Sequence, residues 1–143
     1  MKKAAVVFAN GCEEIEGLTA IDVFRRLGLQ TDMVGLGQKN IEGAHNIQLA
    51  CDSIVDDYLL HDDVVVFPGG VNGANNLKNS DRLMKIMQER QQQGKWNAAM
   101  CAAPIAFARY GLLDGHDYTC YPGFDKQVDQ DANNARFHED IVV

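Results

Sequence analysis

The sequence predicts an α/β fold of the doubly wound type, with helices covering a mostly parallel central sheet. Short, almost wholly apolar runs alternate along the chain with segments whose apolar residues recur at helical spacing. The apolar runs lack the alternation of a half-exposed strand, so we expect them to be buried on both faces, as in a parallel sheet. A length of 143 residues without repeats or linkers fits one domain over residues 1–143.

Recognisable boundaries separate the elements of the first half. A strand at 6–9 ends at Asn10-Gly11, and a helix at 13–27 has acidic residues in its first turn and Gly28 as a C-terminal cap. A second strand follows at 31–35, and a weaker third strand at 47–50 precedes an acidic turn at Asp56-Asp57. The strongest strand signal is the Val-Val-Val-Phe run at 64–67, which Pro68-Gly69-Gly70 closes.

The second half continues the alternation and then loses it. Ser80 is expected to cap a helix that stops at Gly94. The run at 96–100 predicts a buried strand, and a helix is expected directly after Cys101, ending near Gly111. Beyond Gly115 the pattern breaks into short segments around 118–121 and 135–137, and an apolar strand is expected to open at 141–143.

Composition and charge exclude several classes of partner. The net charge of −7 argues against nucleic acid and anionic membranes, because both bind basic patches. No apolar run is long enough to span a membrane, and the short run after Met1 is not a signal peptide, so a cytoplasmic location is expected. The four cysteines have neither zinc-finger nor C-x-x-C spacing, which predicts free thiols and no metal site.

Cys101 is the most informative residue of the chain. It stands between an expected strand and an expected helix, and a nucleophile at such a turn lies beside the amide groups of the helix start. That environment favours a thiolate and would also stabilise an oxyanion. A small buried cysteine that fills a strand-helix corner fits the same pattern, so the residues alone leave both interpretations open.

Three loops are expected at one edge of the sheet, where proteins of this class bind their ligands beyond the carboxyl ends of the strands. The motifs in these loops together resemble those of one family. They are Gly11-Cys12-Glu13-Glu14-Ile15-Glu16, then Phe67-Pro68-Gly69-Gly70 with Gly73-Ala74-x-x-Leu77, and then Met100-Cys101-Ala102-Ala103-Pro104.

Their order and intervals resemble the ThiJ/PfpI superfamily, and within it the branch of the parkinsonism-associated deglycase (DJ-one) and its bacterial relatives. The resemblance runs from Met1 to the end of the chain. It implies a flavodoxin-like doubly wound sandwich, a homodimer and chemistry without a cofactor.

The resemblance also implies roles for four residues. Cys101 matches the family's reactive cysteine, and Glu16 matches an acid that is held protonated and hydrogen-bonds the cysteine sulfur. The alternative for Glu16 is a first-turn acid that complements the helix dipole, which is also our interpretation of Glu13 and Glu14. Gly70 and Ala102 match the positions whose amides form the oxyanion pocket, although Gly70 also fits a tight turn that ends a strand.

The chain departs from the family pattern in two ways. Hydrolytic members of the superfamily place a histidine directly after the cysteine, where this chain has Ala102. The family also continues past Val143 with a Gly-Pro-Gly-Thr turn and a closing helix, so the fold is expected to be C-terminally shortened. A truncated form is our preferred explanation, and a swapped or rearranged dimer is the alternative.

We expect the four histidines to be surface residues. They are His45, His61, His116 and His138.

The sequence and its resemblance favour a cofactor-independent cysteine enzyme that acts on small reactive carbonyls. The reaction would be of the glyoxalase or deglycase type, with Cys101 attacking an aldehyde such as methylglyoxal. The first alternative is a redox-sensing or stress-protective protein in which Cys101 is oxidised. The second alternative is a non-catalytic, truncated member of the family.

Overall fold

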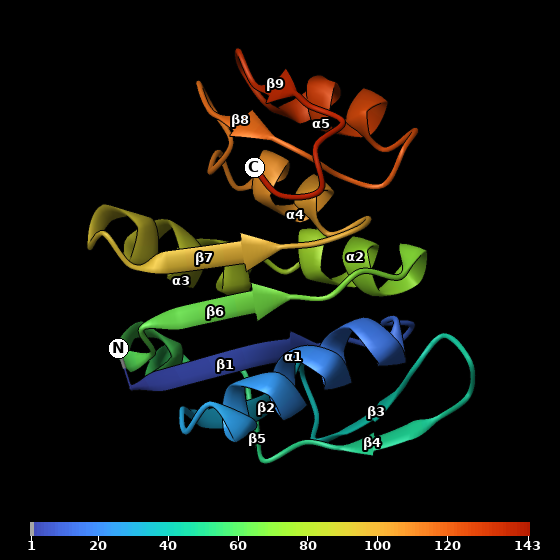
Figure 1. The fold of residues 1–143 in the computed structure, drawn as a ribbon, viewed down its shortest axis with the longest axis vertical. Helices are drawn as coiled ribbons and strands as arrows, with labels where there is room; N and C mark the ends of the chain where they lie inside the picture. Colours follow the sequence, from blue (N-terminus) through green and yellow to red (C-terminus); the bar gives the residue numbers. More distant parts are fainter. Residues whose placement is uncertain (1) are drawn as a thin grey trace.

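The computed structural model describes residues 2–143 and contains a five-stranded sheet in the order β5-β2-β1-β6-β7 (Figure 1). All neighbouring strands in this sheet are parallel. The predicted doubly wound α/β class is therefore confirmed. The strands are β1 (Lys3–Phe8), β2 (Gln30–Gly35), β5 (Ser53–Ile54), β6 (Val64–Phe67) and β7 (Trp96–Ala99).

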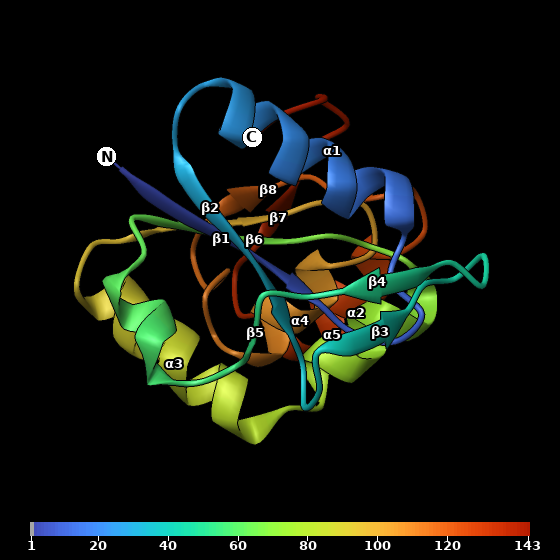
Figure 2. The same cartoon turned by 90° about the horizontal axis from the view of Figure 1, so that it is seen from below.

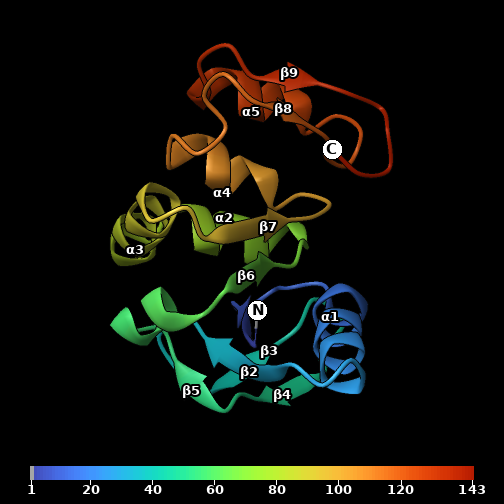
Figure 3. The same ribbon diagram turned by 60° about the vertical axis from the view of Figure 1, so that its left-hand side comes forward.

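Helices cover both faces of the sheet (Figure 2). Helix α1 (Glu14–Arg26) packs on one face, and α3 (Asp81–Gln92) lies on the other with the 3-10 helix η1 (Asp57–His61). Three shorter helices contact one another in sequence order, and they lead away from the sheet on the side of its edge strand β7 (Figure 3). They are α2 (Val71–Lys78), α4 (Pro104–Arg109) and α5 (Asp125–Asp131).

Two small sheets complete the fold. Strands β3 (Asn40–Glu42) and β4 (Gln48–Ala50) form an antiparallel hairpin, and β8 (Asp117–Tyr118) pairs in parallel with β9 (Arg136–Phe137). None of the helices within residues 2–143 is long and apolar enough to span a bilayer.

Strand β1 lies at the centre of the core and is buried on both faces, as its uninterrupted apolar sequence predicts. Ala5 and Val7 join the cluster that includes apolar residues of α3. Val6 and Phe8 join a second cluster, which includes Ile21 of α1. All four β1 side chains are 0% exposed, because successive residues of a strand point to opposite, covered faces of the sheet.

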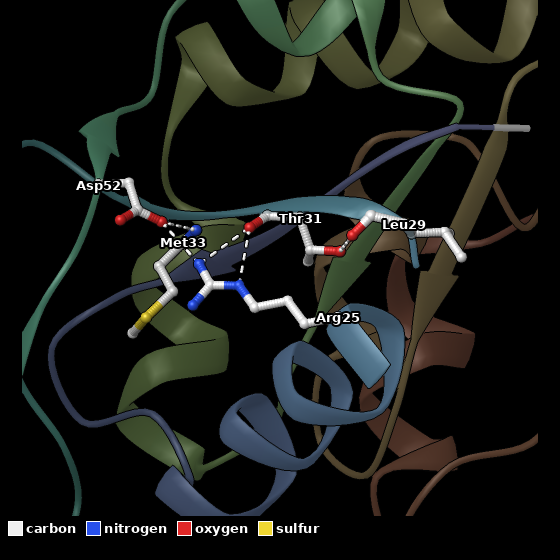
Figure 4. A network of polar contacts seen from close by, with 5 residues as sticks. All are labelled: Arg25, Leu29, Thr31, Met33 and Asp52. Carbon is white, nitrogen blue, oxygen red and sulfur yellow. Dashed lines mark hydrogen bonds and ion pairs between the residues drawn. The ribbon is translucent and has the colours of Figure 1, made fainter. Parts of the chain in front are cut away.

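The C-terminal end of α1 is tied to the sheet through Arg25 (Figure 4). The guanidinium donates to the Thr31 carbonyl oxygen at 2.9 and 3.1 Å, and its Nη2 also contacts Asp52 Oδ2 at 3.1 Å. The same Asp52 oxygen accepts from the Met33 amide at 2.8 Å. One charged side chain thus links the helix end, strand β2 and the segment that leads into β5.

The buried Arg90 side chain ties α3, which lies on the sheet face opposite α1, to η1 and to strand β7. Its guanidinium donates four hydrogen bonds of 2.5–2.9 Å, to the carbonyl oxygens of Leu59, Asp62 and Trp96 and to Asn97 Oδ1. Arg90 is 0% exposed, and burial lowers its pKa to about 10, so it remains charged at neutral pH. Every acceptor lies on η1, on β7 or directly after η1, so this residue fixes the position of the edge strand.

The expected strand at 47–50 forms as β4, but it pairs with β3 in the hairpin and not with the central sheet. The outer strand next to β2 is β5, which has only two residues and begins with the polar Ser53. Such a short, partly polar segment carries no strand signal of its own, and its pairing depends on the tertiary structure.

Three expectations were wrong, the first two because burial depends on neighbours that the local sequence does not specify. Strand β7 forms as predicted but lies at the edge of the sheet, so it is not buried, and Trp96 is 68% exposed. Residues 141–143, which the structure describes, form no strand, and Ile141 is 96% exposed. Helix α4 begins at Pro104, after a turn at 101–103, and not directly after Cys101.

Candidate active site

The four predicted site residues come together where three adjacent parallel strands end. Strand β1 leads into the first turn of α1, which carries Glu16; β6 leads to Gly70; and β7 leads to Cys101 and Ala102. The direction of strand order reverses between β1 and β6, since β2 lies on one side of β1 and β6 on the other. A doubly wound sheet opens a crevice at such a switch point, outside the carboxyl ends of its strands.

Cys101 occupies a strained turn between β7 and α4. Its φ of 57° lies in the left-handed region that residues other than glycine rarely adopt. Two backbone hydrogen bonds hold this turn: Ala103 donates to the Met100 carbonyl at 2.9 Å, and Tyr121 donates to the Cys101 carbonyl at 2.8 Å. The residue is left partly exposed, as a nucleophile at a strand-to-helix turn requires.

Backbone amides and one carboxyl group surround the Cys101 sulfur. Burial raises the pKa of the thiol, and Glu16 raises it further by its charge while it is ionised. Hydrogen bonds from the amides of Ala102 and Gly70 lower the same pKa. Cys101 and Glu16 therefore cannot both be charged without repulsion, so the thiolate is favoured when the carboxyl carries the proton.

Gly69 places the Glu16 carboxyl beside the sulfur, a role that sequence reasoning missed. Its amide donates to Glu16 Oε1 at 2.8 Å. A Cβ atom at this position would lie 2.7 Å from both Glu16 Oε1 and Cys101 Cβ, and 3.1 Å from the Ala102 nitrogen. Only a residue without a side chain lets the three groups meet.

Position 70 requires glycine for a different reason. Its φ is 88°, and a Cβ atom there would lie 2.5 Å from the Gly11 carbonyl oxygen and 2.7 Å from the Glu13 amide nitrogen. The adjacent loops are joined by a hydrogen bond of 3.0 Å from the Glu13 amide to the Gly69 carbonyl. The close approach of the two loops turns the Gly70 amide toward Cys101, so the tight turn and the amide role coexist.

Cys101 lies on the wall of an open cleft of about 1390 Å³. Cys101 and Cys120 both line it, together with Tyr121, strand β7 and the C-terminal residues. His116 also lines the cleft and is exposed, in agreement with its prediction as a surface residue. Cys120 carried no sequence signal as a site residue, because its position depends on how the chain returns after β8.

Glu14 and His45 form a second polar cluster that differs from the expected helix-dipole role. Glu14 is 3% exposed and accepts hydrogen bonds from the His45 amide at 2.8 Å and the His45 ring at 2.9 Å. Burial alone would raise the pKa of Glu14, but hydrogen bonding, mainly from the His45 side chain, lowers it to about 2. Potential ligand atoms of Glu13, Glu14 and His45 lie within 4.8 Å of one another, yet the Glu14 oxygens are already engaged. The cluster acts as an ion pair that fastens the β3–β4 hairpin to α1.

Fold and site together define a class: a doubly wound α/β protein with a cysteine on the turn after its edge strand and an acid beside it. The sequence profile of the DJ-1/PfpI family matches residues 2–143. The chain therefore belongs to the DJ-1/PfpI family.

Individual relatives agree with this assignment. The chain is 36% identical over 132 residues to Protein DJ-1 homolog B of Arabidopsis thaliana, covering 89% of this chain and 30% of that protein. It is 33% identical over 147 residues to Protein dj-1beta of Drosophila melanogaster, covering 99% of this chain and 75% of that protein. A cysteine-to-alanine mutant of a DJ-1 superfamily protein from Salmonella typhimurium has a TM-score of 0.91 at 27% identity, covering 100% of this chain and 77% of that one.

Proposed function

We propose that this chain is a cofactor-independent cysteine enzyme that converts small reactive carbonyl compounds, with methylglyoxal as the representative substrate. The observation that supports the proposal best is the convergence of Glu16 and the Gly70 and Ala102 amides on the Cys101 sulfur. A nucleophile, a proton carrier and two amide donors are the groups that carbonyl addition requires.

The reaction begins when the Cys101 thiolate attacks the aldehyde carbon and forms a C–S bond. The electron pair of the carbonyl moves to oxygen, and the Gly70 and Ala102 amides stabilise that oxyanion before it is protonated to a hemithioacetal. Glu16 carries the proton from the former aldehyde carbon to the neighbouring carbonyl carbon. Water then cleaves the resulting thioester and releases lactate and the free thiol. The aldehyde carbon is oxidised as its neighbour is reduced, so no external electron acceptor is needed.

The test is to measure methylglyoxal loss and lactate formation by purified variants. Cys101→Ser should abolish turnover, whereas Cys51→Ser, which changes a buried thiol in the α1-face cluster, should leave it unchanged. Glu16→Gln keeps a neutral hydrogen-bonding group beside the sulfur but cannot carry a proton. It should therefore preserve alkylation of Cys101 and lower turnover by about 10²–10⁴-fold. Full activity in Cys101→Ser would contradict the proposal.

A second candidate function is protection against or sensing of oxidants through Cys101. Cys101 is partly exposed and lines the cleft, and the same two amides that would bind an oxyanion can bind oxygen atoms on an oxidised sulfur. Selective gain of oxygen at Cys101 after mild peroxide treatment would support this function. Equal oxidation of all four cysteines would contradict it.

A further inference from the structure

Two of the four cysteines share the cleft, although α4 separates them in the sequence. Cys101 follows β7, and Cys120 follows β8. Both line the same cleft, both are partly buried, and both are free thiols. Cys12 and Cys51 differ, since both are buried in the cluster on the α1 face of the sheet.

Backbone geometry brings Cys101 and Cys120 within disulfide range. The Tyr121 amide donates to the Cys101 carbonyl oxygen at 2.8 Å. Across a trans peptide, a near-linear hydrogen bond of this length puts the Cys120 Cα about 3.6 Å from that oxygen. The Cys101 Cα is about 2.4 Å from its own carbonyl oxygen, so the two Cα atoms are at most about 6 Å apart. Disulfides span Cα–Cα separations of about 4.4–6.8 Å.

The surroundings give the two thiols different reactivity. Burial raises the pKa of Cys120 to about 11, and the charges of Asp125, Cys101 and Asp129 add to the rise. Cys120 is therefore protonated at neutral pH and reacts slowly with peroxide by itself. Burial and Glu16 raise the pKa of Cys101 as well, but hydrogen bonds from the Ala102 and Gly70 amides lower it, whereas every influence on Cys120 raises its pKa. Cys101 is therefore the thiol of the two that peroxide attacks first.

We propose that Cys120 is the resolving thiol for Cys101, so that oxidation of this chain ends in a reversible Cys101–Cys120 disulfide. The inference rests on the second candidate function, oxidation of Cys101. In the first step the Cys101 thiolate attacks a peroxide oxygen, the O–O bond breaks, and water or an alcohol leaves. In the second step the Cys120 sulfur attacks the sulfenic sulfur, the S–S bond forms, and hydroxide leaves and is protonated to water. Two thiols and one peroxide thus give one disulfide, one molecule of water from the second step and one molecule of water or alcohol from the first, and a dithiol reductant restores both thiols.

Proximity compensates for the weak acidity of Cys120. A thiol held beside its target reacts at an effective concentration far above that of any thiol in solution. The disulfide also blocks further oxygen addition at Cys101, which would otherwise proceed to the irreversible sulfinic acid.

The test treats the purified full chain with hydrogen peroxide and follows intact mass and peptide maps. The wild-type protein should lose two hydrogen atoms in mass and yield a cross-linked peptide pair containing Cys101 and Cys120, which a dithiol reverses. Cys120→Ser should instead accumulate Cys101 sulfinic acid, about tenfold more than wild type at equal peroxide. Cys51→Ser is the matched control and should behave as wild type.

Three outcomes are informative. Equal sulfinic acid in wild type and Cys120→Ser would overturn the resolving role while leaving oxidation of Cys101 intact. No modification of Cys101 in either protein would overturn the redox function itself, and the resolving role with it. A disulfide that links Cys101 to a different cysteine would also refute the assignment of Cys120. Because methylglyoxal turnover is measured without peroxide, failure of the proposed enzyme activity is detected separately.

Discussion

Replacing Gly69 with alanine tests whether the spacing between the acid and the sulfur controls reactivity. Gly69 does not have a positive φ, so alanine adds no backbone strain, and the effect comes from the new methyl group alone. That methyl would lie 2.7 Å from Glu16 Oε1 and from Cys101 Cβ, about 0.7 Å inside the 3.4 Å at which ordinary van der Waals contact begins. The carboxyl, the cysteine or both must therefore shift by several tenths of an ångström.

A displacement of this size in reacting groups lowers rates by about 10- to 100-fold. We expect that loss in methylglyoxal turnover and in the alkylation rate of Cys101 by iodoacetamide, with unchanged secondary structure by circular dichroism. Gly94→Ala is the control for a general loss of stability: its φ of 73° makes alanine strain the backbone, but its Cβ would meet nothing within 4 Å and the residue precedes β7, at the opposite end of that strand from Cys101. Wild-type rates of turnover and alkylation in folded Gly69→Ala protein would refute the reasoning that this glycine sets the geometry of the pair.

Two further substitutions test the polar contacts that hold the fold around the site. Arg90→Met should lower the free energy of unfolding by about 3–5 kcal/mol, because four buried or partly buried acceptors lose their donor. Chemical denaturation measures this loss, and a value below about 1 kcal/mol would contradict the prediction. Glu14→Gln should return the pKa of His45 from its raised value toward 6.5, as measured by NMR titration, because the Glu14 side chain is the main cause of the rise. The stabilisation that His45 contributes is present below pH 6.5 and is lost as the pH rises through its raised pKa. The difference in stability between wild type and Glu14→Gln should therefore shrink over that pH interval. A constant difference would show that the ion pair is not responsible.

The sequence predicted the helices and strands that a short stretch of residues specifies by itself. The Val64–Phe67 run forms β6, and Ser80 caps α3 with a hydrogen bond of 3.2 Å from Leu83. The edge position of β7 could not be predicted, because burial depends on which strands lie beside it. Helix α2 was not predicted, since its Asn-rich and Gly-containing sequence has a weak helical propensity.

The candidate site likewise contains residues that the sequence predicted and residues that it did not. Cys101, Glu16, Gly70 and Ala102 were predicted because the three motifs resemble those of one family, and the structure places them together. The role of Gly69 was missed, because a backbone amide has no side-chain signature and its partner Glu16 lies 53 positions away. Cys120 was missed for a similar reason, since a single hydrogen bond from Tyr121 brings it to Cys101.

The origin of the site in three adjacent parallel strands has a consequence for when the site forms during folding. Strand β1 is fully buried, and its pairing with β6 sets where both strands end and therefore how far Glu16 lies from Gly69. A shift of one residue in that pairing would move the two loops apart by about 3.3 Å, more than a hydrogen bond tolerates. No partly folded form with a different strand register could hold the carboxyl beside the sulfur. The alkylation rate of Cys101 should consequently report on formation of the β1–β6 pairing, and a time course of refolding should show the native alkylation rate appearing with that pairing, not before it.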